Sequence, residues 1–423
     1  MEFMKMDAKA LQKYKDELMR QYEDFQSQKL KYDMSRGKPC PEQLDLCADM
    51  LNLKEYKTAD GIDCRNYGGI DGIPEAKQLF SNLLEADPDE IIIGGNSALN
   101  MIYDTIAGAM SFGVSAGEIP WGKLPKVKFL CPSPGYDRHF AICELFGIEM
   151  IIVDMNSDGP DMDAVERLVA EDEEVKGMIC VPKYSNPSGI TFSDEVVDRL
   201  ARMKTKAKDF RIFWDNAYCV HDLNEQGDKL KNLFKACKET GNEDRVYVYT
   251  STSKITFPGA GVAMMASSKA NLIQIKKRIS IQTIGPDKLN QLRHVKFLKS
   301  MENIKEHMKK HAMIIGPKFT AVLDILDTQL KGKEIAWWNK PNGGYFISLD
   351  TLDGCAKKVV AMSAEAGVVM TGAGATFPYG KDPRDRNIRI APTFPSLEEL
   401  TKAIKVICIC IQIVSIDKLL ENK

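Results

Sequence analysis

Hydrophobic residues form short, separated runs through the middle of the chain. Between residues 90 and 267, runs of β-branched or apolar residues alternate with stretches of mixed, helix-like polarity. This alternation is typical of βαβ units and predicts a mostly parallel sheet. The seven expected strands are 91–93, 128–131, 150–153, 177–181, 212–214, 246–249 and 261–266.

The two ends of the chain show a different pattern. Near the start, apolar residues recur at three- and four-residue steps and predict an amphipathic helix: Leu11, Tyr14, Leu18, Tyr22 and Phe25. The most hydrophobic run, 406–414, is too short for a bilayer, which needs about 20 residues, and is expected to be a core helix. After residue 290 long helices and strand-like pieces at 344–349 and 388–391 follow. We expect a large domain over 46–295 and a smaller α/β domain formed by 1–45 and 296–423.

Composition narrows the class of protein. With 423 residues and 44% hydrophobic composition, the chain can bury one large core and a second, smaller one. The formal net charge of −2 gives no basic surplus, which argues against a nucleic-acid partner. The 11 cysteines form no CxxC pair, and the first 30 residues lack the apolar segment of a signal peptide. These features predict a reduced, cytoplasmic protein without a membrane segment.

Polar residues stand directly after four of the expected strands, where parallel sheets bind their ligands. Strand 91–93 leads into a small-residue turn that can form an anion cup at a helix N-terminus: Gly95, Asn96 and Ser97. Strand 177–181 is followed by an Asn-Pro turn with Asn186, and strand 212–214 by Asp215. Strand 246–249 is followed by Ser251, Ser253 and Lys254. Taken singly, the small-residue turn, the Asn-Pro turn and Lys254 are better explained by a helix cap, a plain turn and a surface cation, and a helix cap explains Asp215 equally well.

Taken together and in this order, the four sites resemble the fold-type-I aminotransferases that depend on pyridoxal 5'-phosphate. The resemblance is to the divergent aspartate aminotransferase branch, which is related to the aminotransferase domains of MocR-type regulators. Matching motifs run from Ser35-Arg36-Gly37-Lys38-Pro39 to Arg389. The resemblance implies a large domain with a mostly parallel seven-stranded sheet, a smaller α/β domain, and amino transfer from aspartate to 2-oxoglutarate.

The resemblance also implies a role for each matching residue around the cofactor. Lys254 matches the lysine that forms the Schiff base and later moves the proton, and Asp215 matches the acid that keeps the pyridine nitrogen protonated. Asn186 and Tyr218 match the pair that hydrogen-bonds the 3′ oxygen. Tyr136 matches the aromatic residue on the ring face, and His139 matches the histidine that supports Asp215. The residues expected to hold the phosphate are Gly95, Asn96, Ser97, Ser251 and Ser253.

Substrate and partner contacts are implied in the same way. Arg389 matches the arginine that grips the α-carboxylate, for which a planar guanidinium is suited, and Gly37 matches a close backbone approach beside it. Tyr67 resembles the tyrosine that reaches the phosphate of the neighbouring subunit's cofactor, which implies a homodimer with shared active sites. For the distal carboxylate of a dicarboxylic substrate, the candidates are Arg36 and, from the partner subunit, Arg278.

Two features do not fit the family pattern or lie outside it. The family usually has an arginine about eight residues after the lysine, to pair with the phosphate, but 255–262 contains no basic residue. The helix cup and the paired serines are therefore expected to hold the phosphate. His307 and His311 have the spacing of helical metal ligands, but the run between them is basic, with Lys309 and Lys310, and lacks a third ligand, so a solvated helix face and no metal site are expected.

Two alternatives to transamination remain open at the level of the sequence. The same fold supports other pyridoxal reactions, such as a lyase reaction or an acyl transfer. A non-catalytic, MocR-like sensor domain is the second alternative, although the first 30 residues leave no room for a helix-turn-helix domain. Arg389 and the pair formed by Asn186 and Tyr218 favour the aminotransferase.

Overall fold

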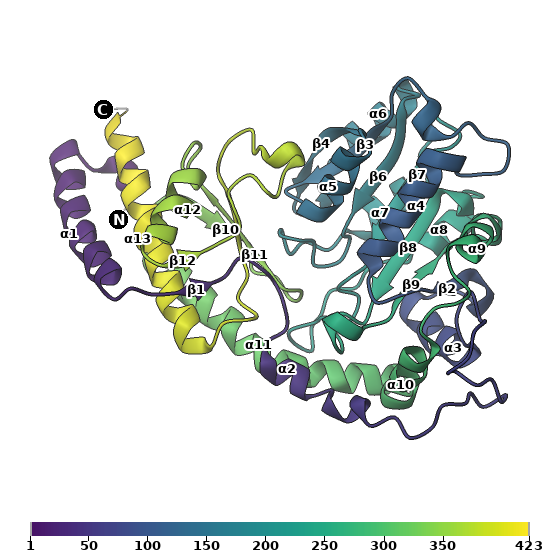
Figure 1. Ribbon diagram of the computed structural model, residues 1–423. Coiled ribbons are helices and arrows are strands. Elements are labelled where there is room, and N and C mark those ends of the chain that lie inside the picture. Colours follow the sequence, from purple (N-terminus) through teal and green to yellow (C-terminus); the bar gives the residue numbers. More distant parts are fainter. Residues whose placement is uncertain (1, 422–423) are drawn as a thin grey trace.

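An eight-stranded sheet forms the larger of two lobes in the computed structural model, which describes residues 2–421 (Figure 1). In spatial order the strands are β2 (Ile91–Ile93), β9 (Ala263–Ala266), β8 (Val246–Ser251), β7 (Arg211–Asp215), β6 (Val175–Cys180), β3 (Lys128–Ser133), β4 (Glu149–Asn156) and β5 (Gly159–Pro160). The five neighbouring strands β8, β7, β6, β3 and β4 run parallel, whereas β9 is antiparallel to β2 and β8, and the short β5 is antiparallel to β4. All seven strands expected from the apolar runs are present.

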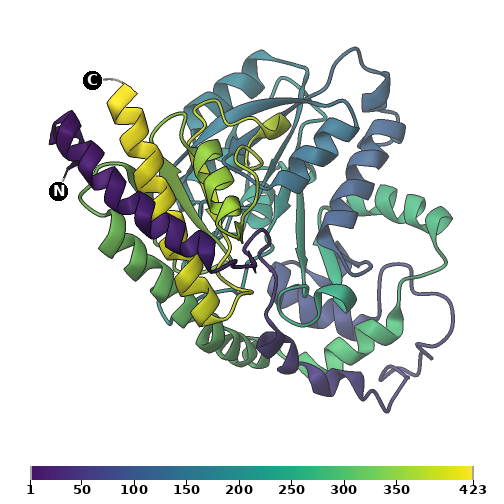
Figure 2. The same cartoon turned by 60° about the vertical axis from the view of Figure 1, so that its left-hand side comes forward.

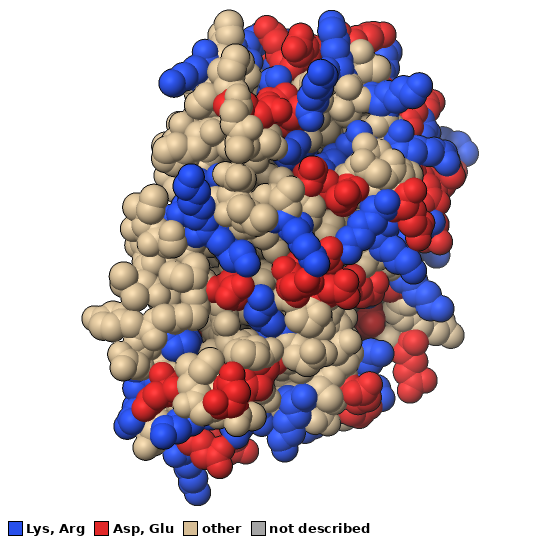
Figure 3. Space-filling model, turned by 90° about the vertical axis from the view of Figure 1, so that its right-hand side faces the viewer, with Lys and Arg blue, Asp and Glu red and all other residues tan. Residues whose placement is uncertain are grey.

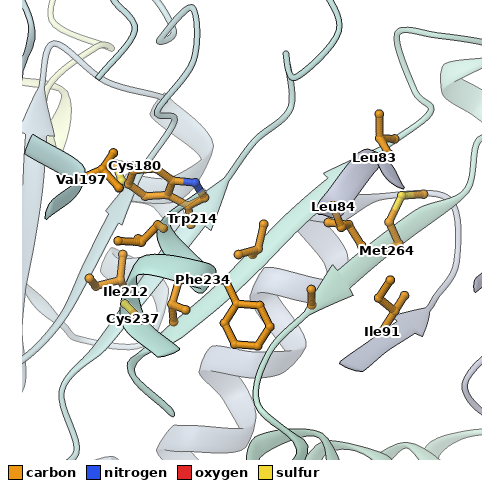
Figure 4. Close-up of a cluster of buried hydrophobic side chains, with 14 of the residues drawn as sticks. Leu83, Leu84, Ile91, Cys180, Val197, Ile212, Trp214, Phe234, Cys237 and Met264 are labelled. Atoms are coloured by element: carbon orange, nitrogen blue, oxygen red, sulfur yellow. The ribbon is translucent and has the colours of Figure 1, made fainter. Parts of the chain in front are cut away.

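Both faces of this sheet are buried, which explains why its strands are apolar at successive positions. On β7, Ile212 and Trp214 belong to one hydrophobic core, and Phe213 between them belongs to the other. Figure 4 shows part of the first core, where Phe234 lies near the sheet. The helices of this lobe are α3 (Pro74–Leu84), α4 (Ala98–Phe112), α5 (Asp137–Leu145), α6 (Met162–Glu171), α7 (Asp194–Arg202), α8 (Leu233–Glu239), α9 (Lys269–Gln282) and α10 (Lys288–Leu298).

The smaller lobe combines segments from both ends of the chain. Its strands form a three-stranded antiparallel sheet, β10 (Ala336–Trp338), β11 (Ile347–Thr351) and β13 (Asn387–Ile390), and a parallel pair, β1 (Tyr32–Asp33) and β12 (Val368–Val369). Its helices are α1 (Ala8–Ser27), α2 (Pro41–Asp45), α12 (Ala356–Glu365) and α13 (Leu397–Glu421). The first and last helices, α1 and α13, pack side by side (Figure 2).

The predicted terminal helices are both confirmed. Leu11, Leu18 and Tyr22 are buried on α1, whose first turn is capped by the Asp7 carboxylate at 2.7 Å from Ala10 N. The hydrophobic run 406–414 is buried within α13. Within residues 2–421, none of the helices combines the length and the apolar composition that crossing a bilayer requires.

One helix of 30 residues, α11 (Met301–Leu330), connects the lobes and contributes to both cores. Ile304 and Met308 belong to a core of the large lobe, whereas Phe319 and Leu326 belong to the core of the small lobe. Because this helix is shared, the domain division at residues 46 and 296 stays a prediction. The 11 cysteines, all within the described residues, are free, and ten of them are buried.

Candidate active site

Two adjacent strands of the large sheet bring Lys254 and Asp215 to the same edge. Asp215 is the last residue of β7, and Lys254 follows the end of β8. The Lys254 Nζ atom lies 5.1 Å from the ring centroid of Tyr218 and 5.8 Å from that of Tyr345. Desolvation lowers the pKa of Lys254, and the negative charge of Asp215 opposes this shift. The amine is therefore held among aromatic rings near a carboxylate.

The two oxygens of Asp215 have different environments. Oδ2 lies 3.0 Å from His139 Nε2, and both side chains are nearly inaccessible, with exposed fractions of 6% and 2%. Oδ1 is also buried but has no hydrogen-bond partner among residues 2–421. A buried carboxylate oxygen without a partner is costly, so a ligand that donates a proton or carries positive charge would be favoured there. The ring of Tyr136 packs edge-on against His139, with centroids 4.9 Å apart.

A small polar cup lies at the start of α4, where helix N–H groups favour anions. Ser251 Oγ donates to Ser253 Oγ at 3.0 Å, and Ser253 Oγ donates to the Asn96 carbonyl oxygen at 3.3 Å. The Ser97 side chain makes no capping hydrogen bond, so the N-cap explanation that the sequence allowed is not realised. A Cβ added to Gly95 would meet no described atom within 4 Å, which leaves open space in the cup.

The guanidinium of Arg389 lies across the boundary between the lobes. It projects from β13, and its terminal nitrogens bond to Asp137 Oδ1 at 3.0 Å, Asn186 Oδ1 at 3.3 Å and Thr371 Oγ1 at 2.9 Å. Its Nε is buried and has no partner within the described chain. Asn186 therefore links the predicted cofactor residues to the predicted carboxylate site.

Position 37, next to Arg389, has to be a glycine because the ring of Phe346 occupies the space that a side chain would need. A Cβ at this position would lie 2.5 Å from Cζ of Phe346. The same ring lies 4.9 Å from the guanidinium carbon of Arg389. The close approach predicted for Gly37 thus serves to seat Phe346 against the arginine.

Three predicted residues lie outside this cluster. Tyr67 is at the surface with an exposed fraction of 82%, and Arg36 is also exposed. Arg278 is half-buried and lines a cavity of about 570 Å³ that also reaches Gly94 and Gly95. Among residues 2–421 this guanidinium has no hydrogen bond or ion pair.

Several site residues were missed from the sequence, and one expectation was wrong. Tyr345 stacks on Tyr218 with ring centroids 5.9 Å apart; the Gly-Gly turn before it was the available signal. Nothing in the sequence marked Asp137 and Thr371 as partners of Arg389. The pair His307 and His311 does not form a solvated face, because both side chains are buried, with exposed fractions of 7% and 1%. Cys47 also lies beside them, at 3.5 Å from His307 Nε2.

Comparison with known proteins adds independent information. A family model described as aspartate amino-transferase matches residues 6–423. The chain is 46% identical over 409 residues to a putative aminotransferase of Mycolicibacterium smegmatis, and 43% identical over 408 residues to an aspartate aminotransferase of Corynebacterium glutamicum. These matches cover 96% of this chain, and 96% and 94% of the relatives. A crystal structure of an aspartate transaminase from C. glutamicum superposes with a TM-score of 0.96 at 42% identity, covering 99% of both chains.

Proposed function

Because the chain belongs to the aspartate aminotransferase family and is an aminotransferase, we propose that it carries pyridoxal 5'-phosphate on Lys254 and moves an amino group between aspartate and 2-oxoglutarate. The observation that carries the proposal is the pair formed by Lys254 and Asp215, with His139 fixing one carboxylate oxygen and leaving the other free. When bound, the cofactor supplies an aldehyde for the lysine and a ring that accepts electrons from the substrate α-carbon.

The residues at the sheet edge fit this cofactor. Asp215 Oδ1 is free to accept a hydrogen bond from a protonated ring nitrogen, and its charge would keep that nitrogen protonated. Burial of Lys254 favours the neutral amine, which is the form that attacks a carbonyl and later accepts and returns a proton. In this proposal Tyr218 and Asn186 would donate hydrogen bonds to the 3′ oxygen of the cofactor.

The cup at the N-terminus of α4 fits a phosphate. It offers backbone N–H groups, the hydroxyls of Ser97, Ser251 and Ser253, and open space at Gly95. These groups are neutral, so hydrogen bonds and the helix dipole would take the place of the arginine that 255–262 lacks.

The proposal includes a homodimer with shared active sites. Large apolar side chains are exposed on the large lobe, including Phe112 at 66% and Ile281 at 85%, and apolar exposure of this kind favours an interface. Both line the cavity that reaches Gly95, which would admit a partner's Tyr67 to the phosphate cup. Figure 3 shows the side of the lobe on the right in Figure 1: charges of both signs are intermixed, and an uncharged strip runs along one edge. The eleven free cysteines support a reducing, cytoplasmic location.

Substrate choice depends on a second cation. We propose that Arg389 binds the α-carboxylate and that the partner subunit's Arg278 binds the distal carboxylate. Arg278 is half-buried, has no hydrogen bond or ion pair among residues 2–421, and lines the same cavity as Phe112 and Ile281, where the proposed partner would pack. Arg36 is a weaker candidate because it is exposed. An unpaired buried cation would penalise donors that lack a distal carboxylate.

An amino-donor screen of the cofactor-loaded protein tests this function. We expect kcat/KM for aspartate to exceed that for alanine, phenylalanine and lysine. In Arg278→Ala the preference for aspartate over alanine should fall about tenfold or more, whereas Arg36→Ala should keep it, since a charge-assisted hydrogen bond contributes about 1.5–3 kcal/mol. An aromatic or neutral aliphatic donor that outperforms aspartate would refute the dicarboxylate assignment.

A further inference from the structure

Three buried histidines surround the turn that carries Lys254. His294 lies on α10, and His307 and His311 lie on α11. All three contact residues 252–256. These contacts are not explained by cofactor or substrate binding, because they are made on the turn itself.

Backbone hydrogen bonds fix the start of this turn. Ile255 N and Thr256 N both donate to the Thr252 carbonyl oxygen, at 2.9 and 2.8 Å, and Thr252 N donates to the Val262 carbonyl oxygen at 2.8 Å. The Ile255 carbonyl oxygen and the hydroxyls of Thr252 and Thr256 are left for side chains to bind.

His294 supplies one such group, and its neighbours determine its tautomer. Its Nδ1 lies 2.7 Å from the Asn290 carbonyl oxygen, which can only accept, so Nδ1 carries the proton. Its bare Nε2 has one lone pair, which accepts from the hydroxyl of Thr256 at 2.9 Å or from that of Thr252 at 3.1 Å. Since Val262 N also donates to the Thr252 hydroxyl, at 2.9 Å, the first residue of the turn is tied on two sides.

The other two rings converge on a single carbonyl oxygen. Ile255, the residue after Lys254, has its oxygen 2.8 Å from His307 Nε2 and 3.1 Å from His311 Nε2. Cys47 Sγ lies 3.6 Å from the same oxygen. A carbonyl has two lone pairs, so it can accept from both rings; the two Nε2 atoms also lie 3.0 Å from each other, which links the rings directly.

The tautomer of His311 follows from Gln43. The Gln43 Oε1 atom accepts from Cys40 N at 3.2 Å, so its Nε2 faces His311 Nδ1, at 2.9 Å, as a donor. His311 Nδ1 is therefore the acceptor, and the ring proton sits on Nε2, directed at Ile255. The same Gln43 amide donates to the Tyr345 hydroxyl at 3.1 Å, which joins this network to the rings around Lys254.

This tautomer also argues against a metal ion at the same place. The possible ligand atoms of Cys47, His307 and His311 lie within 4.8 Å of one another, as in a zinc site. A metal would need the lone pair of His311 Nε2, but the Gln43 amide places a proton on that atom. Turning the amide over would set its N–H groups against Cys40 N and remove the cap of α2. Hydrogen bonding to Ile255 accounts for the cluster without this conflict.

We propose that His294, His307 and His311 are positioning residues for amino transfer: they fix the 252–256 turn from two helices and thereby hold the Lys254 amine at its place over Tyr218. This inference rests on the proposed role of Lys254. Because none of the three rings needs to touch cofactor or substrate, their effect should appear in the lysine even before the cofactor is bound.

The test removes the N–H donors and then restores them. In His307→Leu and His311→Leu, kcat should fall about 10- to 100-fold with little change in KM, the range expected when a catalytic group is misplaced by about 1 Å. In the cofactor-free protein, competitive acetylation of Lys254 against pH should show its apparent pKa rising towards the unperturbed value of about 10.4, because a looser turn exposes the amine to water. His311→Gln, which keeps an N–H donor, should restore both readouts in part.

Leu326→Ala is the matched control. Leu326 is buried on the same helix but lies about 22 Å beyond His311 along the helix axis, at a rise of about 1.5 Å per residue. This variant loses core contacts and should leave the Lys254 profile unchanged. Equal changes in Leu326→Ala and the histidine variants, or no change in the latter, would overturn the proposal.

Metal analysis of the protein as isolated is a second test, which distinguishes hydrogen bonding from zinc binding in the histidine cluster. We expect no stoichiometric zinc, and zinc that disappears in Cys47→Ser would overturn the hydrogen-bond assignment. Failure of the proposed function is distinguishable: full activity in Lys254→Ala would remove the catalytic role of the lysine, while the acetylation profile would still report on the turn.

Discussion

The two halves of the site hold their charged groups in opposite ways. On the large lobe, Asp215 has one oxygen fixed by His139, and the other is buried without a partner among residues 2–421. On the small lobe, Arg389 has both terminal nitrogens bonded to Asp137, Asn186 and Thr371, and only its Nε lacks a partner in the described chain. The first arrangement leaves a whole carboxylate oxygen open, whereas in the second the two terminal nitrogens, which form the fork of the guanidinium, are already bonded to side chains of the protein.

This difference matches two kinds of ligand. A fixed carboxylate with one free oxygen suits a group that stays bound, because its orientation is set before binding. A guanidinium with temporary partners suits a carboxylate that enters and leaves, because Asp137 and Thr371 satisfy it between visits. Substitutions in each half can therefore distinguish the two kinds of binding.

Removing the lysine should have the largest effect. Lys254→Ala should lower kcat by at least about 10⁴-fold, because it removes both the nucleophile and the proton carrier. Steady-state kinetics check the rate, and borohydride reduction followed by peptide mapping should place the cofactor label on Lys254 in the unmodified protein. A label on another lysine would contradict the assignment.

The free oxygen of Asp215 is the next target. Asp215→Asn should lower kcat roughly 10²- to 10³-fold, because a neutral amide no longer keeps the ring nitrogen protonated. Circular dichroism should show an intact fold, since the residue is one of many on the sheet. Turnover near that of the unmodified protein would remove this residue from the mechanism.

Acid should destabilise the large-lobe half of the site more than the small-lobe half. Burial lowers the pKa of His294 and of His311 to about 4, so both are neutral in the folded state, whereas in the unfolded chain they titrate near 6.5. Their contribution to the free energy of unfolding is complete above pH 6.5 and declines as the pH falls towards 4, because only the unfolded chain binds the protons. Each histidine should account for a loss of about 2 kcal/mol at pH 5.

Guanidinium unfolding at pH 7 and pH 5 measures this effect. His294→Gln, which cannot be protonated, should lose about 2 kcal/mol less than the unmodified protein over the same interval. Paired carboxylates such as Asp63, whose pKa is lowered to about 2, titrate outside this range. Equal losses in both proteins would show that His294 does not contribute.

On the small-lobe half, a conservative change should still be harmful. Arg389→Lys keeps the charge but loses the planar fork, and kcat/KM should fall about 10- to 100-fold, mainly through KM. Initial-rate kinetics with aspartate and with alanine should show similar losses, because both share the α-carboxylate. A loss confined to aspartate would assign Arg389 to the distal carboxylate instead.

The smallest effect is expected at Asp137. If Arg389 binds the α-carboxylate as proposed, Asp137 competes with the substrate for it, and this competition is weakened by solvent because the Asp137 side chain is 32% exposed. Asp137→Asn should therefore lower KM by a factor of about 2 to 5 with kcat nearly unchanged. A rise in KM would show that Asp137 holds Arg389 in place for the substrate.

The large-lobe half of the candidate site could be predicted from the sequence because of the way a parallel sheet is built. Runs such as 91–93 and 212–214 are apolar at every position because both faces of their strands are buried. Parallel strands bring their carboxyl ends to one edge, so the residues that follow them, Asp215 and Lys254, meet there.

The remainder of the site could not be predicted because it depends on contacts between residues that are far apart in the sequence. Arg389 bonds to Asp137 and Thr371 through the packing of one lobe on the other. His307 and His311 were assigned to a solvated face because lysines separate them, yet their helix buries Ile304, Met308 and Ile315 on the same side. Helical spacing over this longer window, with the histidines counted as core positions, would have predicted their burial.

The pairing of α1 with α13 sets an order for how the protein is made. The apolar side of α1 is covered by a helix that ends at residue 421, so it leaves the ribosome long before its partner exists. At about 5–20 residues per second, the intervening synthesis takes roughly 20–80 s. During that time the large lobe can complete its sheet, while α1 has to wait with Leu11, Leu18 and Tyr22 exposed. We therefore expect the small lobe, and with it Arg389, to be assembled last, after translation of the large lobe is complete.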